Sequence, residues 1–243
     1  MSLRPWNNLP IDDCGEPLEA LPRELLRLEP HPYMTLGAPY GADGGPFQLR
    51  RGVVARLLQA QLHLQQHSPR YRLAIFDGWR PLAVQAFMVQ EAIAQTCRER
   101  GLDPAGSGPD QEAVLADVGR FWAPPNPDPS APPPHSTGAA VDLTLADRLT
   151  GVPVAMGSAI DAIGAVSEPD HWLEQARQGA PGQRRQLLLE WHHHRCLLRD
   201  AMQAAGFSQH PNEWWHFSWG DQLWAWRRGE PCACYGRVDG PGG

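Results

Sequence analysis

The chain of 243 residues is 42% hydrophobic and 20% charged, a composition that excludes an intrinsically disordered or membrane-embedded protein. Its formal net charge of −6, with no basic stretch interleaved with aromatic residues, argues against binding to nucleic acid. A chain of this length can form one substantial core. We therefore expect a single domain over residues 1–243 whose partner is a small molecule.

The N-terminal residues and the cysteines bear on where the protein works. Residues 1–22 lack the basic region and apolar run of a secretory signal, and no part of the chain reads as a membrane span. Five cysteines without a framework spacing are typical of reduced thiols, so we expect a cytoplasmic protein. Cys232 and Cys234 form a C-x-C pair that is either incidental or a second metal or redox site. The sequence does not indicate an oligomeric state.

The first half of the chain predicts two long helices around a strand. Residues 1–49 are rich in proline and glycine, and we expect an irregular N-terminal wrap with short strands. Apolar residues then recur at helical spacing from Val53 to Leu64, and this helix ends before Pro69. Residues 71–76 predict a strand, followed by an Asp-Gly turn and a helix over residues 81–101. Arg80 therefore lies at a strand-to-helix junction, where a rigid scaffold holds functional side chains.

A long loop is predicted over residues 101–134, with a short helix near "PDQEAVLADVGRF". Within this loop, "PPNPDPSAPPP" has too few free N–H groups for a sheet and favours extended polyproline II geometry. Two interpretations remain open. This segment is either a stiff surface connector or a wall or lid beside a site.

The second half of the chain predicts a strand over residues 140–145, a helix from about Arg184 to Ala205, and a short aromatic strand in "EWWHFSW". The residues on the apolar stripe of this helix are Leu187, Trp191, Leu198 and Met202. Residues 227–243 are predicted to form a flexible tail. Helices and strands in this order, with few βαβ units, indicate an α+β fold in which helices flank a central antiparallel sheet.

The motif "HSTGAAVDLTL" places a carboxylate in a half-buried strand. Asp142 alternates with the apolar Val141 and Leu143, and a buried carboxylate must be paired, hydrogen-bonded or bound to a metal. His135 lies seven residues earlier across a glycine-containing turn, and His216 in "EWWHF" is the third candidate. Two imidazoles and one carboxylate give zinc three protein ligands and leave the fourth position for water, which is the arrangement of a catalytic site.

Glu213, three residues before His216, is the candidate general base for a zinc-activated water. On an ideal strand, residues i and i+3 point to opposite faces. Glu213 and His216 therefore serve one site only if Glu213 lies in the turn before the strand or a bulge rotates it. The turn-like "QHPNE" favours the first of these options.

Taken together, "DGWRP", "HSTGAAVD" and "EWWHF" resemble the zinc D-alanyl-D-alanine dipeptidases (VanX-type). These belong to the wider family of zinc D,D-peptidases, which shares a fold with the hedgehog signalling domain. The resemblance runs from about Tyr33 to Trp219 and includes "MGSAID" and "LLRDAMQAAGF". It implies a hydrolase that uses one zinc ion to split the D-alanyl-D-alanine dipeptide.

The resemblance also implies a role for each site residue. His135, Asp142 and His216 match the zinc ligands, and Glu213 matches the catalytic base. Arg80 matches the arginine that stabilises the tetrahedral intermediate, as a fixed cation facing developing oxyanion charge should. Asp161 in "MGSAID" is similar to the aspartate that holds the free amino group of the substrate, and Tyr33 to a tyrosine near that group.

Other interpretations remain open. "EWWHF" is closer to the dipeptidases than the "EPWHF" typical of D,D-carboxypeptidases, yet a carboxypeptidase or another hydrolase of small cell-wall peptides is the main alternative. A zinc-binding domain without turnover is a third hypothesis. Pro133 and Pro134 stand where the family usually carries a serine just before the first histidine ligand, a departure that bears on substrate preference. The consecutive histidines 192–194 diverge by about 100° on a helix and cannot all face one ion.

Overall fold

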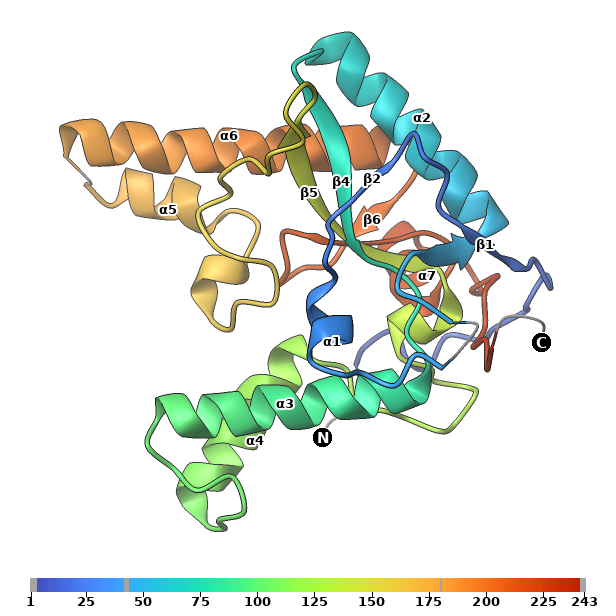
Figure 1. Cartoon of the computed structure of the whole chain (residues 1–243). Helices are drawn as coiled ribbons and strands as arrows, with labels where there is room; N and C mark the ends of the chain where they lie inside the picture. The colour runs from blue at the N-terminus through green and yellow to red at the C-terminus, as the bar shows by residue number, and fades with distance from the viewer. Residues whose placement is uncertain (1–3, 42–43, 180, 241–243) are drawn as a thin grey trace.

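Within residues 4–41, 44–179 and 181–240, the part of the chain that the computed structural model describes, a five-stranded sheet has the order β2-β4-β5-β7-β6 (Figure 1). A separate two-stranded sheet pairs β1 with β3. The strands are β1 (Leu18–Ala20), β2 (Leu26–Arg27), β3 (Gln48–Arg50), β4 (Tyr71–Asp77), β5 (Ala140–Asp147), β6 (Ser208–Gln209) and β7 (His216–Ser218). The α-helices are α1 (Pro32–Thr35), α2 (Arg51–His67), α3 (Leu82–Glu99), α4 (Pro109–Phe121), α5 (His171–Arg177), α6 (Gly182–Ala204) and α7 (Gln222–Arg228). Two 3-10 helices are η1 (Pro134–Thr137) and η2 (Ala165–Ser167).

The larger sheet is antiparallel except at one edge. β4 pairs with β5, β5 with β7, and β7 with β6 in antiparallel fashion, whereas the two-residue β2 runs parallel to β4. A parallel pair needs a long crossover connection, and the chain between β2 and β4 supplies one that includes α2. The α+β fold with a central sheet flanked by helices is thus confirmed, with one parallel pairing that the sequence did not predict.

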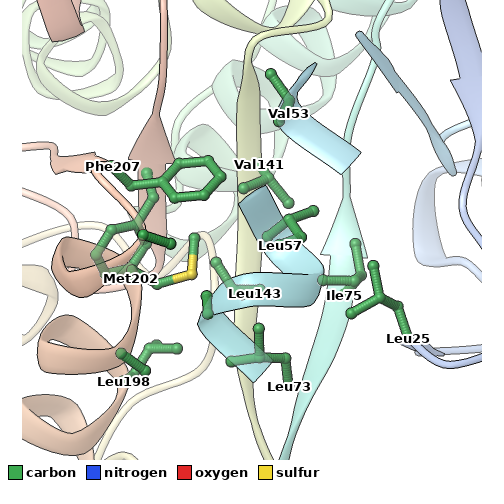
Figure 2. Packing of buried hydrophobic residues seen from close by; sticks show 14 of the residues in the cluster. Leu25, Val53, Leu57, Leu73, Ile75, Val141, Leu143, Leu198, Met202 and Phe207 are labelled. Atoms are coloured by element: carbon green, nitrogen blue, oxygen red, sulfur yellow. The ribbon is translucent and has the colours of Figure 1, made fainter. Parts of the chain in front are cut away.

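Helices α2 and α6 form the main core with one face of this sheet. Figure 2 shows Val53 and Leu57 of α2 against Ile75 and Leu143 of the central strands, with Met202 of α6 beside them. In β5, Leu143 alternates with the polar Asp142 and Thr144 because successive side chains of a strand point to opposite faces. The cluster therefore fixes which face of β5 is left for Asp142. Truncating a side chain such as Leu57, which is fully buried, costs about 2–5 kcal/mol.

A second apolar cluster joins α1, α3 and α4, and Figure 1 shows α3 and α4 side by side, away from α2 and α6. It contains Tyr33 of α1, Val84 and Met88 of α3, and Val114 and Val118 of α4. Helix α4 has 13 residues, so the predicted short helix in the long loop is a full element. Its residues Val114 and Val118 repeat at i, i+4 and bury one stripe against α3.

Two expectations of detail are wrong. Leu187, assigned to the buried stripe of the long helix, is 43% exposed, and the neighbouring Leu188 is buried in its place. The predicted flexible tail over residues 227–243 begins inside α7, and its described part packs against the N-terminal wrap. Ala233 forms a β-bridge with Ile11, and the buried Tyr235 donates a hydrogen bond to Glu16. Apolar burial, which the sequence pattern did not reveal, holds this segment in place.

Among the described residues, no helix combines the length and the apolar character that crossing a membrane requires.

Candidate functional site

The sheet register places two carboxylates and one imidazole side by side on three neighbouring strands. Asp142 of β5 lies directly opposite His216 of β7 and, on its other side, opposite Asp77 of β4. A register shift between Ile75 and Asp77 allows the last of these pairings, because a bulge re-aims the residues that follow it. Asp142 and His216 are each no more than 4% exposed, so their charges are held away from solvent.

His135 completes a compact group with these two residues. Its Nε2 atom lies 3.2 Å from His216 Nδ1 and 3.2 Å from Asp142 Oδ2, and His216 Nδ1 lies 3.0 Å from Asp142 Oδ1. Zinc holds nitrogen and oxygen ligands at about 2.0–2.1 Å in a tetrahedron, which separates neighbouring ligand atoms by about 3.3 Å. The observed separations of 3.0 to 3.2 Å are close to this value, with each oxygen of Asp142 facing one imidazole, so the three predicted ligands fit a zinc ion.

The surroundings of both imidazoles orient them toward this centre. His135 Nδ1 donates a hydrogen bond of 2.7 Å to the carbonyl of Gly78, which leaves the lone pair of Nε2 facing the group. His216 Nε2 faces Ser218 Oγ at 3.4 Å, so its Nδ1 faces inward. His135 belongs to η1, which ends at Gly138 with a φ of 69°. A Cβ atom there would lie 2.4 Å from Leu18 Cδ2, so the tight turn requires glycine.

Glu213 lies in the turn that precedes β7, as expected from its sequence context. Its Oε2 atom is 3.7 Å from His216 Nδ1, and its Oε1 atom is 3.6 Å from His210 Nδ1. Burial raises the pKa of Glu213 to about 8, against the opposing effect of His216. The flanking Trp214 and Trp215 are buried, which keeps water from the back of this carboxylate.

Arg80 extends into the site from the junction of β4 and α3. Its Nη2 atom donates to Asp142 Oδ2 at 2.8 Å and to Tyr33 Oη at 3.3 Å, while Nε donates to Asp77. Burial alone would raise the pKa of Asp77, but Arg80 and His31 outweigh burial and hold this pKa below its usual value. The interpretation of Asp77 as the residue that orients Arg80 is therefore supported by a direct contact.

Asp161 and Tyr33 meet at the side of the site. Tyr33 Oη donates a hydrogen bond of 2.5 Å to Asp161 Oδ2, and Asp161 has a φ of 64°, in the left-handed region. Burial raises the pKa of Asp161 to about 7, although the charge of Arg80 opposes this shift. A non-glycine residue in this backbone conformation is uncommon and persists only where the surrounding structure holds it.

Arg195 of α6 holds the loop that carries Asp161. Its guanidinium donates to the carbonyls of Met156, Val166 and Glu168 and to Ser158 Oγ, at distances from 2.8 to 3.1 Å. Ser158 Oγ also accepts from the indole of Trp214 at 2.9 Å. One buried cation thereby links the Asp161 loop to the tryptophan next to Glu213.

These residues open into a pocket of about 440 Å³ between the sheet and the end of α4. Asp142, His216, Glu213 and Asp161 all line it. Prolines of the "PPNPDPSAPPP" segment also line it, from Pro124 to Pro134. Of the two interpretations of this segment, the structure supports the wall beside a site.

Sequence reasoning missed several residues of the site. His210 is buried against Glu213 and stacks edge-on with His216, and its position three residues before Glu213 was the available signal. His31 contacts Asp77 from a loop, at 3.2 Å, and carried no motif. Within the described residues, the ligand group of His135, Asp142 and His216 includes neither the C-x-C cysteines nor the histidines 192–194. Of those histidines, His194 is buried and His193 is exposed, as a surface helix predicts.

The chain is similar to several known proteins. The family model described as D-ala-D-ala dipeptidase matches residues 27–232. A D-alanyl-D-alanine dipeptidase of Synechocystis sp. is 43% identical over 98% of each chain, and one of Enterococcus faecalis is 30% identical over 69% of this chain and 70% of its own. A vancomycin-resistance D,D-pentapeptidase solved with Zn(II) is 13% identical over 94% of this chain and 96% of its own, with a TM-score of 0.43. From the family match and the Synechocystis relative, the chain belongs to the D-ala-D-ala dipeptidase family of peptidases.

Proposed function

We propose that this chain hydrolyses the D-alanyl-D-alanine dipeptide to two molecules of D-alanine, with one zinc ion held by His135, Asp142 and His216. The observation that carries the proposal is the buried group of two imidazole nitrogens and the Asp142 carboxylate, in contact at 3.0 to 3.2 Å, with the Glu213 carboxylate beside His216. The names of the relatives supply the substrate.

His135 and His216 would hold the ion through neutral nitrogens, and Asp142 would balance part of its charge. Zinc in such a site supplies Lewis acidity, which lowers the pKa of water to near neutrality. The hydrogen bond from His135 Nδ1 to Gly78 keeps the correct tautomer for this task. Both Glu213 and Arg80 would be superfluous in a structural zinc site, which argues against a non-catalytic domain.

Glu213 is the proton carrier of the proposed reaction. Its Oε2 atom takes a proton from the attacking water as the oxygen bonds to the peptide carbonyl carbon. The same carboxyl then gives that proton to the peptide nitrogen, and the carbon–nitrogen bond breaks to release the second D-alanine. The turn before β7 holds Glu213 on the same side as His216, which the strand periodicity alone would forbid.

Arg80 would stabilise the negative charge that develops on the carbonyl oxygen. Its orientation is fixed by Asp77, so little reorganisation is needed when that charge appears. Asp161, supported by Tyr33, would bind the free amino group of the dipeptide. This requirement for a free amine separates the proposal from its main alternative, a D,D-carboxypeptidase, which acts on substrates whose amine is acylated.

The base is tested with a Glu213→Gln variant. We expect zinc content equal to that of the unmodified protein, measured by atomic emission, and turnover of D-alanyl-D-alanine reduced by about 100-fold or more. A variant that retains both zinc and near-normal turnover would show that Glu213 is not the base. Chelation should abolish activity, and zinc should restore it.

The substrate is tested with a panel of dipeptides that varies the chirality at each residue, together with N-acetyl-D-alanyl-D-alanine. We expect cleavage of the D,D dipeptide and a loss of about 100-fold on acetylation, because the buried Asp161 carboxylate would lose its charged partner. Cleavage of L,L but not D,D dipeptides would contradict the proposal. Equal rates on the acetylated peptide would favour the carboxypeptidase.

A further inference from the structure

The dipeptide of the proposed function carries a charge at each end, and only one end has a partner among the residues discussed so far. Its amine would face Asp161. Its carboxylate needs a cation or several hydrogen-bond donors, because leaving a charge unpaired in a pocket is costly. The inference below rests on the proposed function and concerns this second end.

Arg80 is already committed to other groups. Its guanidinium contacts Asp77, Asp142, Tyr33 and Gln85, which engage four of its five N–H groups, and the proposed reaction assigns the remaining one to the developing oxyanion. The proline segment that lines the pocket cannot bind the carboxylate through its backbone at Pro132, Pro133 and Pro134, because proline has no N–H group to donate. The carboxylate partner must therefore come from another side of the pocket.

Residues 4–9, which we call the N-terminal strap, form that side. Arg4, Trp6 and Asn7 line the pocket although they precede every other element of the structure. Arg4 donates one hydrogen bond to the carbonyl of Arg120 and one to that of Gly119, both at 3.0 Å, where α4 ends. A guanidinium has five N–H groups, so donors remain for a ligand.

The charge of Arg4 is not matched by an acidic partner. Within the described residues, no carboxylate lies within ion-pair distance of its guanidinium. Arg4 and Glu213 line the same pocket. Burial lowers the pKa of Arg4, and the charge of Glu213 opposes this shift. A chain of contacts also joins them. The Arg4 guanidinium lies 5.8 Å from the centre of the Trp6 ring, which packs edge-on against His210 at 5.6 Å.

Proximity to Glu213 is what the reaction requires of a carboxylate anchor. The nitrogen that Glu213 protonates and the carboxylate of the leaving D-alanine are bonded to the same Cα atom. The group that holds this carboxylate must therefore be a neighbour of Glu213. The amine, which Asp161 would bind, lies on the other side of the scissile bond.

Gln222 of α7 holds the strap in position. Its Nε2 atom lies 2.6 Å from the carbonyl oxygen of Leu9, 3.3 Å from that of Asn7 and 2.9 Å from that of Ser130. One buried amide thus ties the strap to the proline segment. The strap also folds on itself through hydrogen bonds from Asn7 N to Arg4 O and from Leu9 N to Trp6 O. These hydrogen bonds fix the backbone that carries Arg4.

We propose that the N-terminal strap completes the substrate pocket and that Arg4 binds the C-terminal carboxylate of the dipeptide. The strap would thereby select substrates whose chain ends one residue beyond the scissile bond. A guanidinium is suited to this role because its planar N–H groups match the two oxygens of a carboxylate.

The test compares two substrates, D-alanyl-D-alanine and D-alanyl-D-alaninamide, on the zinc-loaded protein and two variants. Arg4→Met removes the charge and keeps the length of the side chain. Arg120→Met is the matched control, because this nearby arginine is exposed and lies outside the pocket. We expect Arg4→Met to lower kcat/KM on the acid by about 10- to 100-fold, mainly through KM, and on the amide by less than about 3-fold. Arg120→Met should change neither value.

An equal loss on the acid and the amide would overturn the anchor, because a merely structural role of Arg4 would affect both substrates alike. No loss on the acid would overturn it as well. Binding to a Glu213→Gln background, measured by calorimetry with and without Arg4→Met, separates this inference from the reaction. If the unmodified protein does not hydrolyse the dipeptide, the proposed function is refuted. The anchor still stands in that case if Glu213→Gln binds the acid more tightly than the amide only when Arg4 is present. Equal affinity for acid and amide would refute the anchor.

Discussion

Tyr33 and Asp161 are 128 residues apart in the chain, yet the tyrosine hydroxyl donates a 2.5 Å hydrogen bond to the carboxylate. The fold thus brings together two residues whose roles the sequence alone supported only weakly. The contact places a carboxylate of raised pKa at the pocket wall, with one oxygen engaged by the tyrosine and the other left for a ligand. This geometry supports the amine-binding role that we propose for the pair, a role that would make the binding step sensitive to pH.

The pH dependence of KM tests this role. Because burial raises the pKa of Asp161 to about 7, the fraction of charged carboxylate increases as pH rises through neutrality. The substrate amine stays protonated up to its own pKa of about 8. We therefore expect KM to fall between about pH 6 and about pH 7.5, and Asp161→Asn to raise KM about 10-fold or more and to lose this dependence. The same pH dependence in the variant would assign it to another group.

Asp77 is expected to act on turnover through Arg80 without touching the substrate. It does not line the pocket, yet it accepts hydrogen bonds from Arg80 and from Tyr40. Asp77→Asn removes the charge that fixes the guanidinium, so kcat should fall by about 10-fold or more while zinc content is unchanged. Steady-state kinetics with metal analysis measure both quantities.

The matched control for Asp77 is Asp117→Asn, which breaks an exposed pair with Arg100 and should leave kcat unaltered. A large increase in KM with unchanged kcat in Asp77→Asn would contradict a role in stabilising the transition state. Loss of zinc in the same variant would instead place Asp77 in support of the metal site through His135, which lies 3.6 Å away.

The sequence was sufficient for those parts of the site that short motifs encode. Strand alternation put Asp142 on the face opposite Leu143, and the turn residues before β7 allowed Glu213 to share a side with His216. The three long helices α2, α3 and α6 lie where their apolar periodicity predicts them. Each of these features depends on residues within a few positions of one another, which is the range over which sequence patterns are informative.

Long-range contacts were not predictable in this way. His31 and Arg195 join the site through single side chains whose partners lie 27 or more residues away, and no local pattern marks them. The exposed Leu187 shows the same limit, because a stripe on a helix wheel does not reveal which side its tertiary neighbours cover. The tail was misjudged because its glycines and prolines suggest a loop, whereas Tyr235 anchors it in the core.

Arg195 should control substrate binding from a distance through the Asp161 loop. Arg195→Met leaves four acceptors of this loop without their donor, three of them backbone carbonyls. We expect unfolding by denaturant to show a loss on the order of 3 kcal/mol, because each buried unsatisfied carbonyl costs about 1–3 kcal/mol. KM for the dipeptide should rise more than kcat falls, since Asp161 moves and Glu213 does not.

The control for Arg195 is Arg199→Met on the same helix, where the arginine is partly exposed and pairs with Asp170. This variant should keep its KM and lose about 1 kcal/mol or less. Equal changes of kcat and KM in Arg195→Met, or an unaltered KM, would contradict the role of this arginine in positioning Asp161.

Gln222 gives an independent measure of the strap. Gln222→Leu conserves volume and removes the amide that reaches the carbonyls of Asn7, Leu9 and Ser130. The strap should then open more often, because three partly buried acceptors lose their donor while the contacts of Arg4 with α4 remain. We expect KM to rise by about 3- to 10-fold and amide hydrogen exchange to quicken in residues 4–9, with zinc content unchanged. Gln95→Leu, on the exposed face of α3, is the matched control and should alter neither measurement. Faster exchange in the strap without any change in KM would mean that the strap is held by Gln222 but contributes nothing to substrate binding.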